Sequence, residues 1–259
     1  MQINEIYFSP TGTTKKIVRT ISRNIKEELN SSTKNIDLTN LESRKKEYKF
    51  TKEDITIIGF PVYYGRVPTI LNEVINNIKG ENTKTIIIGV YGNRDYDDAL
   101  LEIKNNLEKN GLNIIAAGAF IGEHSFSDKL AANRPDMKDL GIASDFASKI
   151  IKKLETEEEE NKLEITGNYP YKEFNEISAS PKTTDDCIKC LACVQNCPTE
   201  IINSEDPKNF IDKNGCICCC ACVKVCPTNA KYFDDERVVG AKTKLESICK
   251  ERKEPKIFI

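Results

Sequence analysis

The sequence has 259 residues but only one histidine, His124, and no tryptophan. A single imidazole excludes metal sites and catalytic arrays that need several histidines. There are 38 basic and 40 acidic residues, so the chain lacks the basic excess that nucleic-acid binding requires. It also lacks an uninterrupted apolar run long enough to cross a bilayer. We therefore expect no nucleic-acid partner and no membrane span.

Two further absences concern export and cofactors. The first residues, M-Q-I-N-E, lack the pattern of a signal peptide, which predicts a cytoplasmic protein. No Gly-x-Gly-x-x-Gly strand–helix unit is present, so a dedicated NAD(P)H domain is not predicted. In a reducing compartment the 11 cysteines favour metal binding over disulfides.

Most of the cysteines fall in two similar runs. Residues 187–198 read C-I-K-C-L-A-C-V-Q-N-C-P, and residues 216–227 read C-I-C-C-C-A-C-V-K-V-C-P. With Cys218 and Cys220 set aside, both follow Cys-x2-Cys-x2-Cys-x3-Cys-Pro. A [4Fe-4S] cube needs one thiolate on each of its four irons, and such a run can supply them. Zinc sites use pairs of cysteines set far apart, so zinc fits this spacing less well.

The two runs, within residues 183–235, resemble those of bacterial dicluster ferredoxins. In that family the fourth cysteine of each run ligates the other cluster. The resemblance implies two [4Fe-4S] clusters. The first would be held by Cys187, Cys190, Cys193 and Cys226, and the second by Cys216, Cys219, Cys222 and Cys197. Cys218 and Cys220 depart from the family pattern. Either could replace Cys219 or Cys222 in a shifted register or be a buried thiol, and Cys249 is interpreted as a core thiol.

The N-terminal region begins with a strand, a loop and a helix. Residues 3–8 form a short apolar run, residues 9–14 are rich in hydroxyls, and apolar residues then recur at helical spacing to Leu29. A helix N-terminus offers unpaired N–H groups to a phosphate, and Gly12 lets the backbone close around it. Because the loop has no Gly-x-x-x-x-Gly-Lys pattern, a single phosphate monoester is favoured over a nucleoside triphosphate.

This loop, Ser9-x-Thr11-Gly12-x-Thr14, resembles the phosphate loop of flavodoxins. The resemblance implies FMN. Its phosphate would be held by Ser9, Thr11, Gly12, Thr13 and Thr14. A threonine-rich helix cap without a ligand is the alternative.

The rest of the first half alternates between strands and helices. We predict strands over residues 34–38, 55–60, 85–90 and 113–120. We predict helices over residues 69–79, closed by Gly80, 97–110 and 135–154, with Pro135 in the first turn of the last. This order predicts an α/β fold with a doubly wound, five-stranded parallel sheet of order 2-1-3-4-5, as in flavodoxins. The cofactor would then lie at the carboxyl ends of the strands.

Two loops at those ends offer aromatic and glycine residues to a flat ring system. We expect them to hold the isoalloxazine through Pro61, Val62, Tyr63, Tyr64, Gly65, Tyr91, Gly92, Asn93 and Tyr96. At least one of these tyrosines should belong to the core or the rim. Arg66 and Arg94 are expected to be solvated. His124 lies in the loop after the fifth strand, where a hydrogen-bonded loop residue is favoured over a proton-transfer role.

The domain organisation follows from these segments. We expect a flavodoxin-like domain over residues 1–156, an acidic or polar linker over 157–182 and a small α+β dicluster ferredoxin domain over 183–240. The linker is interpreted as a solvated spacer. Residues 241–259 would form a C-terminal helix, near 243–250, and an apolar tail that packs on one domain.

As a whole, the chain resembles the fused flavodoxin–ferredoxin proteins of anaerobes. The resemblance implies an intracellular electron-transfer flavoprotein that passes electrons between low-potential donors, two clusters and FMN. Acids at Asp95, Asp97 and Asp98 would favour a low flavin potential. The alternatives are an FMN-dependent reductase of a quinone, nitro compound or ferric species fed through the clusters, and a redox-sensing protein with structural clusters. A ferredoxin or oxidoreductase is the expected partner, with a homodimer as an assembly to test.

Overall fold

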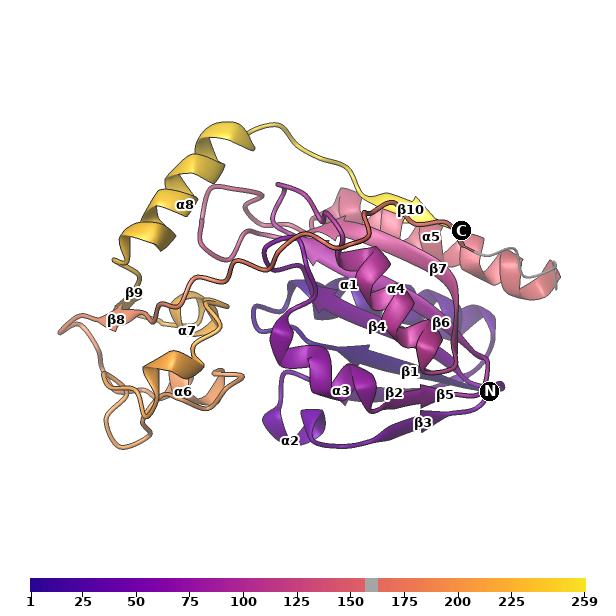
Figure 1. Cartoon of the computed structure of the whole chain (residues 1–259), viewed down its shortest axis with the longest axis horizontal. Coiled ribbons are helices and arrows are strands. Elements are labelled where there is room, and N and C mark those ends of the chain that lie inside the picture. The colour runs from indigo at the N-terminus through magenta and orange to yellow at the C-terminus, as the bar shows by residue number, and fades with distance from the viewer. Residues whose placement is uncertain (157–162) are drawn as a thin grey trace.

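The first half of the chain folds around one twisted sheet. A computed structural model describes residues 1–156 and 163–259, so the first part of the predicted linker, 157–162, lies outside the described residues. The sheet has the order β10-β7-β6-β4-β1-β2 (Figure 1). Its parallel strands are β1 (Gln2–Tyr7), β2 (Ser32–Asp37), β4 (Ile55–Pro61), β6 (Thr83–Tyr91) and β7 (Leu112–Ile121). The predicted order 2-1-3-4-5 is confirmed for these five strands.

Helices cover both faces of this sheet. On one face α1 (Thr13–Glu28) and α5 (Met137–Thr156) pack together through residues that include Ile21 and Phe146. On the other face lie η1 (Thr69–Leu71), α3 (Asn72–Asn76) and α4 (Ala99–Lys109) (Figure 1). Because both faces are covered, the central strands are apolar almost throughout.

The prediction of one helix over residues 69–79 is wrong in its second half. Helix α3 ends at Asn76, and β5 (Ile78–Gly80) instead pairs in parallel with β3 (Tyr48–Phe50). Gly80 therefore lies in a strand and closes no helix. This short pairing satisfies backbone groups that a longer helix would have satisfied, so the tertiary contact outweighs the helical spacing of the apolar residues.

Two other helix boundaries also differ. Helix α5 begins at Met137, and Pro135 lies before it. The Asp136 carboxylate accepts from the Lys138 and Asp139 amides and so caps the helix. Helix α8 (Glu236–Ile248) begins seven residues before the predicted helix, since Asp235 caps it through the Arg237 amide.

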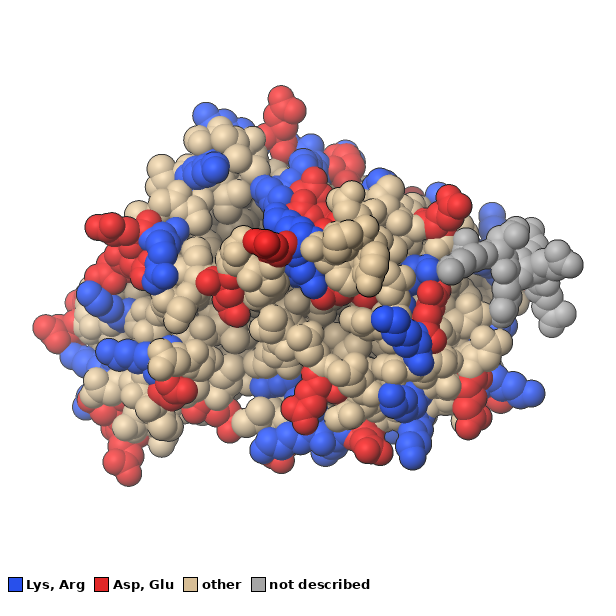
Figure 2. Space-filling model, viewed as in Figure 1, with Lys and Arg blue, Asp and Glu red and all other residues tan. Residues whose placement is uncertain are grey.

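The cysteine-rich region forms a small second domain. Its elements are β8 (Lys182–Thr183), α6 (Ala192–Gln195), η2 (Lys213–Gly215), α7 (Ala221–Lys224) and β9 (Lys231–Tyr232), with β8 and β9 antiparallel. The two cysteine runs fold alike, because α6 and α7 each follow a left-handed residue, Leu191 and Cys220. On the face shown in Figure 2, acidic and basic side chains are interspersed over both domains.

The chain then returns to the first domain. After α8 a segment crosses the molecule to β10 (Lys256–Phe258), which pairs antiparallel with β7 (Figure 1). The expected packing of the apolar tail on one domain thus takes the form of a sixth strand. None of the helices in the described ranges combines the length and apolar character needed to span a bilayer.

The described part of the predicted linker is not a solvated spacer. Leu163 is buried in the core of the first domain. The Asp98 carboxylate accepts from the backbone amides of Asn168 and Lys172 at 2.7 Å each. Phe174 packs edge-on against Tyr64 with ring centroids 5.4 Å apart. Residues 163–177 therefore run along the first domain and place side chains beside its carboxyl-end loops.

Candidate functional site

The loop after β1 has the geometry of an anion site. Gly12 has φ +84°, a left-handed conformation that favours glycine, and immediately precedes α1. The Lys15 amide donates to Ser9 Oγ at 3.0 Å, and the Gly12 amide donates to the Ser9 carbonyl. The N-cap residue Gly12 offers no side-chain cap, so apart from the Lys15 amide the first N–H groups of α1 remain available to a ligand.

A buried hydroxyl at this helix end tests the fit of a phosphate. Thr14 is only 1 % exposed, yet its Oγ1 has no hydrogen-bond partner among the described residues. A buried hydroxyl without a partner is costly, and a phosphate oxygen would satisfy it. Ser9, Thr11 and Gly12 line a cavity of about 840 Å³ between this loop and the cysteine-rich domain. The residues present therefore fit the phosphate of FMN.

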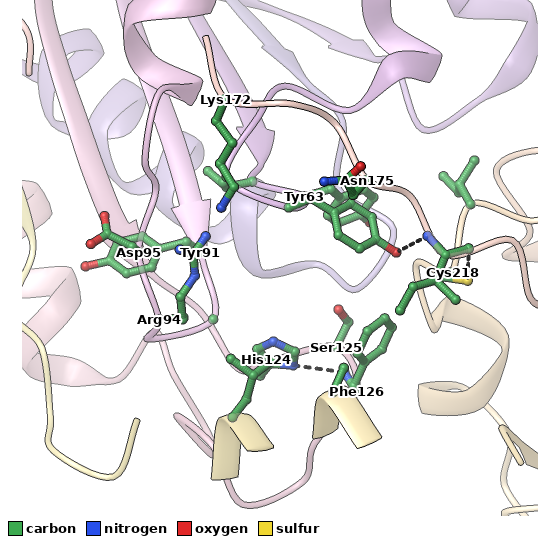
Figure 3. Close-up of a pocket in the computed structure, with 18 of the residues that line it drawn as sticks. Tyr63, Tyr91, Arg94, Asp95, His124, Ser125, Phe126, Lys172, Asn175 and Cys218 are labelled. Carbon is green, nitrogen blue, oxygen red and sulfur yellow. Dashed lines mark hydrogen bonds between the residues drawn. The ribbon is translucent and has the colours of Figure 1, made fainter. Parts of the chain in front are cut away.

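A second cavity, of about 320 Å³, lies at the carboxyl ends of β4, β6 and β7. Six of the nine residues predicted to hold the ring line it: Val62, Tyr63, Tyr64, Gly65, Tyr91 and Gly92. Figure 3 shows how Tyr63 and Tyr91 surround it together with His124 and Cys218. Burial raises the pKa of Tyr64 and of Tyr91 to about 12, so both phenols stay neutral. Aromatic rings and small residues around such a space suit a flat, amphipathic ring system.

The structure does not bring three of the predicted flavin residues to this cavity. Pro61 ends β4 outside the cavity wall. The Asn93 amide nitrogen instead donates to the Cys249 and Glu251 carbonyls at 2.8 Å each. Tyr96 is buried, and its hydroxyl pairs with Thr166 Oγ1 at 2.8 Å. These two side chains are engaged with segments that lie far away in the sequence, which the local loop pattern does not encode.

The remaining charges of these loops are paired more closely than predicted. Arg94 lines the cavity, where its guanidinium bonds the Asp97 carboxylate. Asp97 also pairs with Lys172 at 2.7 Å. Arg66 is not solvated either, because it is largely buried against Glu102. Of the three predicted acids only Asp95 lies in the cavity wall, so the structure does not place a cluster of free carboxylates there.

His124 is a hydrogen-bonded member of the cavity wall. Its Nδ1 accepts from the Phe126 amide at 3.1 Å, which places the proton of the neutral ring on Nε2. Burial, assisted by the nearby charge of Lys224, lowers the pKa of His124 to about 4. The ring fits only because residue 92 is glycine, since a Cβ there would lie 2.3 Å from His124 Cδ2.

Several residues of the cavity wall lie outside the two predicted loops. They come from residues 163–177, from the second cysteine run and from α8: Lys172, Glu173, Asn175, Ile177, Ile217, Cys218, Ala241 and Leu245. The first four reach the cavity because their segment runs along the first domain, and the last four because the second domain and α8 dock on it. No local signal in the sequence indicates that docking.

The cysteines divide between two small cavities of the second domain. One is lined by Cys187, Cys190, Cys193 and Cys226, and the other by Cys197, Cys216, Cys219 and Cys222 together with the extra cysteine Cys220. Each cavity thus collects the first three pattern cysteines of one run and the last cysteine of the other run, and the second cavity contains Cys220 in addition. Across residues 1–156 and 163–259, no group of three or more acidic, cysteine or histidine side chains is arranged around a single ion. Four sulfurs spread around a cavity fit a cube, in which each thiolate meets a different iron.

The extra cysteines hydrogen-bond to the backbone. Cys218 Sγ donates to the Ile177 and Ala179 carbonyls at 3.3 and 3.2 Å. Cys220 is buried, and its Sγ donates to the Cys218 carbonyl. Cys249 is half-buried at the end of α8. All the cysteines are free, with no disulfide among the described residues.

Comparison with known proteins agrees with this division. Residues 6–127 match the family model of the flavodoxin domain, and residues 181–203, which hold the first cysteine run, match that of the 4Fe-4S binding domain. Among curated proteins no significant match was found.

Among solved structures, three matches cover about 60 % of this chain. A flavodoxin from the domain Archaea is 17 % identical, covering 60 % of this chain and 99 % of its own, with a TM-score of 0.42. A Streptococcus pneumoniae TIGR4 flavodoxin is 13 % identical, covering 59 % and 99 %, with a TM-score of 0.41. An azoreductase from Bacillus anthracis is 13 % identical, covering 59 % and 99 %, with a TM-score of 0.42.

The two family matches, the sheet order and the grouped cysteines lead to one identification. The chain is a fusion of a flavodoxin domain, whose cofactor is FMN, with a ferredoxin domain that binds iron and sulfide as 4Fe-4S.

Proposed function

We propose that this electron-transfer flavoprotein exchanges electrons between two [4Fe-4S] clusters in its second domain and FMN in its first. When bound, FMN supplies one- and two-electron chemistry and each cluster supplies one-electron chemistry. The protein residues bind these groups, hold them close together and exclude water. An external low-potential redox protein, such as a ferredoxin or an oxidoreductase, is the proposed partner.

One observation carries this proposal. Ile217 lies in the wall of the 320 Å³ cavity and also in the wall of the cavity formed by Cys197, Cys216, Cys219 and Cys222. Cys218, the next residue, lines the first of these cavities as well. The proposed ring site and the proposed second cluster site are therefore separated by the residues between two cysteine ligands.

The proposed ligand roles follow from the cavities. The FMN phosphate is assigned to Ser9, Thr11, Gly12, Thr13 and Thr14. The ring is assigned to Val62, Tyr63, Tyr64, Gly65, Tyr91 and Gly92. The first cluster is assigned to Cys187, Cys190, Cys193 and Cys226, and the second to Cys197, Cys216, Cys219 and Cys222. We place the domain boundaries at 1–156 and 183–240, with 163–177 and 241–259 packed mainly on the first domain and 178–182 in contact with the second.

Polar contacts support a docked arrangement of the two domains. Lys224 of α7 pairs with Glu123, and its Nζ also donates to the Ser127 carbonyl at 3.1 Å. The Ser127 hydroxyl donates to Glu246 of α8 at 2.6 Å. These contacts hold the second domain and α8 against the loop that follows β7.

The size of the ring cavity favours a carrier over a reductase of a small acceptor. Ligand sites usually measure about 300–1,000 Å³, and 320 Å³ lies at the lower end of that range. Ile217, Cys218, Ala241 and Leu245 cover this cavity from the second domain and α8. A quinone or nitro compound would need the same space as the ring, so that activity would require undocking.

An anaerobic reduction experiment tests the proposal. The purified protein is mixed in turn with reduced ferredoxin, NADH and NADPH, and bleaching of the flavin absorbance is followed. We expect bleaching by reduced ferredoxin and none by either nucleotide. The control is protein in which Cys219→Ala removes one proposed ligand of the second cluster. Equal bleaching rates in the variant and the wild type would contradict the proposal.

A further inference from the structure

Arg44 is a buried cation for which the site described so far gives no role. It ends the short helix α2 (Leu41–Arg44) and is only 5 % exposed. Within residues 1–156 and 163–259 its guanidinium has no carboxylate within ion-pair distance. Burial lowers the pKa of Arg44, while the more distant charges of Glu200 and Cys197 oppose this change. Arginine nevertheless stays protonated in proteins, so a full positive charge is buried here.

The guanidinium joins the two domains through carbonyl oxygens. Its Nη1 donates to the Leu38 and Thr39 carbonyls at 2.6 and 2.9 Å, at the end of β2. Its Nη2 donates to the carbonyl of Pro198, the residue after Cys197. Arg44 therefore ties the first domain to the loop that carries a proposed ligand of the second cluster.

The same side chain lies next to the phosphate loop. The Ser9 amide, the first of that loop, donates to Thr39 Oγ1 at 2.9 Å. The guanidinium lies 5.7 Å from the centroid of the Phe8 ring. Thr39 also lines the 840 Å³ cavity, together with Ser9, Cys197 and Pro198. One buried charge thus stands between the proposed phosphate site and the proposed second cluster site.

A buried charge without an ionic partner is costly, because carbonyl dipoles replace only part of its hydration. Glu200 is exposed, so water screens its charge. The phosphate and the thiolate-ligated cluster are both anionic, and both belong beside Arg44 if the proposed ligand sets are correct. Binding of either group would then offset the cost of burying the guanidinium.

We infer that Arg44 is a positioning residue that serves both cofactor sites, holding the Cys197 loop on the phosphate loop and supplying the positive charge that both anionic groups share. The inference rests on the ligand sets of the proposed function. It has two consequences: Arg44 strengthens FMN binding, and it favours the reduced state of the cluster that Cys197 ligates, because that state carries one more negative charge.

The test uses the full-length, cofactor-loaded protein and three variants. Arg44→Gln removes the charge but keeps a donor, and Arg44→Lys keeps the charge but loses the planar fork. Lys45→Gln removes the charge of the neighbouring side chain, which is exposed, and serves as the matched control. We measure the dissociation constant of FMN and the midpoint potential of each cluster signal by paramagnetic resonance during a redox titration.

For Arg44→Gln we expect FMN binding at least threefold weaker. The reduction equilibrium of one cluster should fall at least threefold, about 28 mV at 59 mV per tenfold change, while the other cluster stays unchanged. Arg44→Lys should keep the wild-type potential, and Lys45→Gln should change neither quantity. If Arg44 were purely structural, the Lys and Gln variants would show the same shift of the midpoint potential, and that result would overturn the inference. An Arg44→Gln variant with unchanged FMN affinity and unchanged potential would overturn it too.

Two features keep the test decisive. If Arg44→Gln does not assemble its clusters, the cluster midpoint potential of Arg44→Lys still tests the inference. The charge is kept in that variant, so a shifted potential would contradict a role of the charge. Neither measurement involves electron transfer between the cofactors. Failure of the proposed function would appear as a flavin that reduced ferredoxin does not bleach, with the two Arg44 effects still present.

Discussion

The Asn93 side-chain amide donates to the Cys249 carbonyl oxygen at 2.8 Å, and so joins two residues 156 positions apart in the chain. Asn93 Oδ1 in turn accepts from the Lys253 amide at 3.1 Å. Arg252 strengthens the same crossing through Asp136. The Asn93 side chain therefore fixes the segment between α8 and β10 to the loop after β6. The sequence pattern instead predicts that Asn93 contacts the flavin.

Replacing Asn93 separates these two roles. Asn93→Ala removes three hydrogen bonds of a buried side chain, so amides of residues 249–258 should exchange with solvent about tenfold faster. The FMN dissociation constant should stay within twofold of the wild-type value. The measurements are hydrogen exchange by mass spectrometry and a flavin titration, with the exposed Asn76→Ala as control. Lost FMN with unchanged exchange at 249–258 would restore the flavin role.

Removal of the unpartnered Thr14 hydroxyl should weaken FMN binding without lowering the stability of the FMN-free protein. Thr14→Val keeps the shape but removes the group proposed to bond the phosphate, so FMN binding should weaken about tenfold. The FMN-free protein should keep or gain unfolding free energy, since an unsatisfied buried hydroxyl is removed. Flavin titration and urea denaturation give the two values. Thr20→Val, on the exposed side of α1, is the control. Equal FMN affinity in Thr14→Val and wild type would remove Thr14 from the site.

The close approach of Gly92 and His124 can be tested by a pair of substitutions. Gly92→Ala should lower the unfolding free energy by about 1–3 kcal/mol, because the new methyl group would overlap the imidazole. In a His124→Ala background most of this penalty should vanish, as a double-mutant cycle would show. Gly141→Ala is the matched control, since a Cβ there meets nothing within 4 Å. It lies inside α5 and should stabilise the protein by about 0.5–1 kcal/mol. An additive cycle would contradict the overlap.

The lowered pKa of His124 predicts a pH dependence of stability. The folded-state pKa of about 4 lies below the ordinary value of 6.5, so the unfolded chain binds the proton more readily. This contribution to stability is complete above pH 6.5 and falls as the pH drops towards 4, by up to about 1.4 kcal/mol per pH unit. Urea denaturation between pH 7.5 and 5 should show a steeper decline for the wild type than for His124→Gln. Parallel declines would show that the ring is not held neutral in the folded protein.

The sequence predicts best the elements whose residues are apolar on both faces. Strands β4, β6 and β7 are buried on both sides, so their continuous apolar runs are visible without any partner. The segment of β5 carries the same apolar spacing as the helix before it. Its pairing with β3 depends on residues about 30 positions upstream, which a local pattern does not include.

The candidate site divides in the same way. Tyr63 and Tyr91 were predictable because they follow the carboxyl ends of recognisable strands. The grouping of cysteines came from the resemblance to dicluster ferredoxins. Residues such as Ile217 and Leu245 were not predictable as cavity walls, because they reach the proposed flavin site only through domain docking, and Ile177 reaches it through a segment that packs along the first domain. The burial of Arg44 was not predictable either, since an arginine in a polar segment normally lies on the surface.

Strand β10 changes what the second domain is in topological terms. Because the chain returns to β7, the cysteine-rich domain is an insertion tethered at both ends to the first domain, at its C-terminal side through the sheet. A domain held by two tethers stays at a high effective concentration beside its docking face even when its contacts open. Undocking of the second domain is then a unimolecular step whose rate does not depend on protein concentration. Separation of β10 from β7 would let the undocked domain move farther from the first domain.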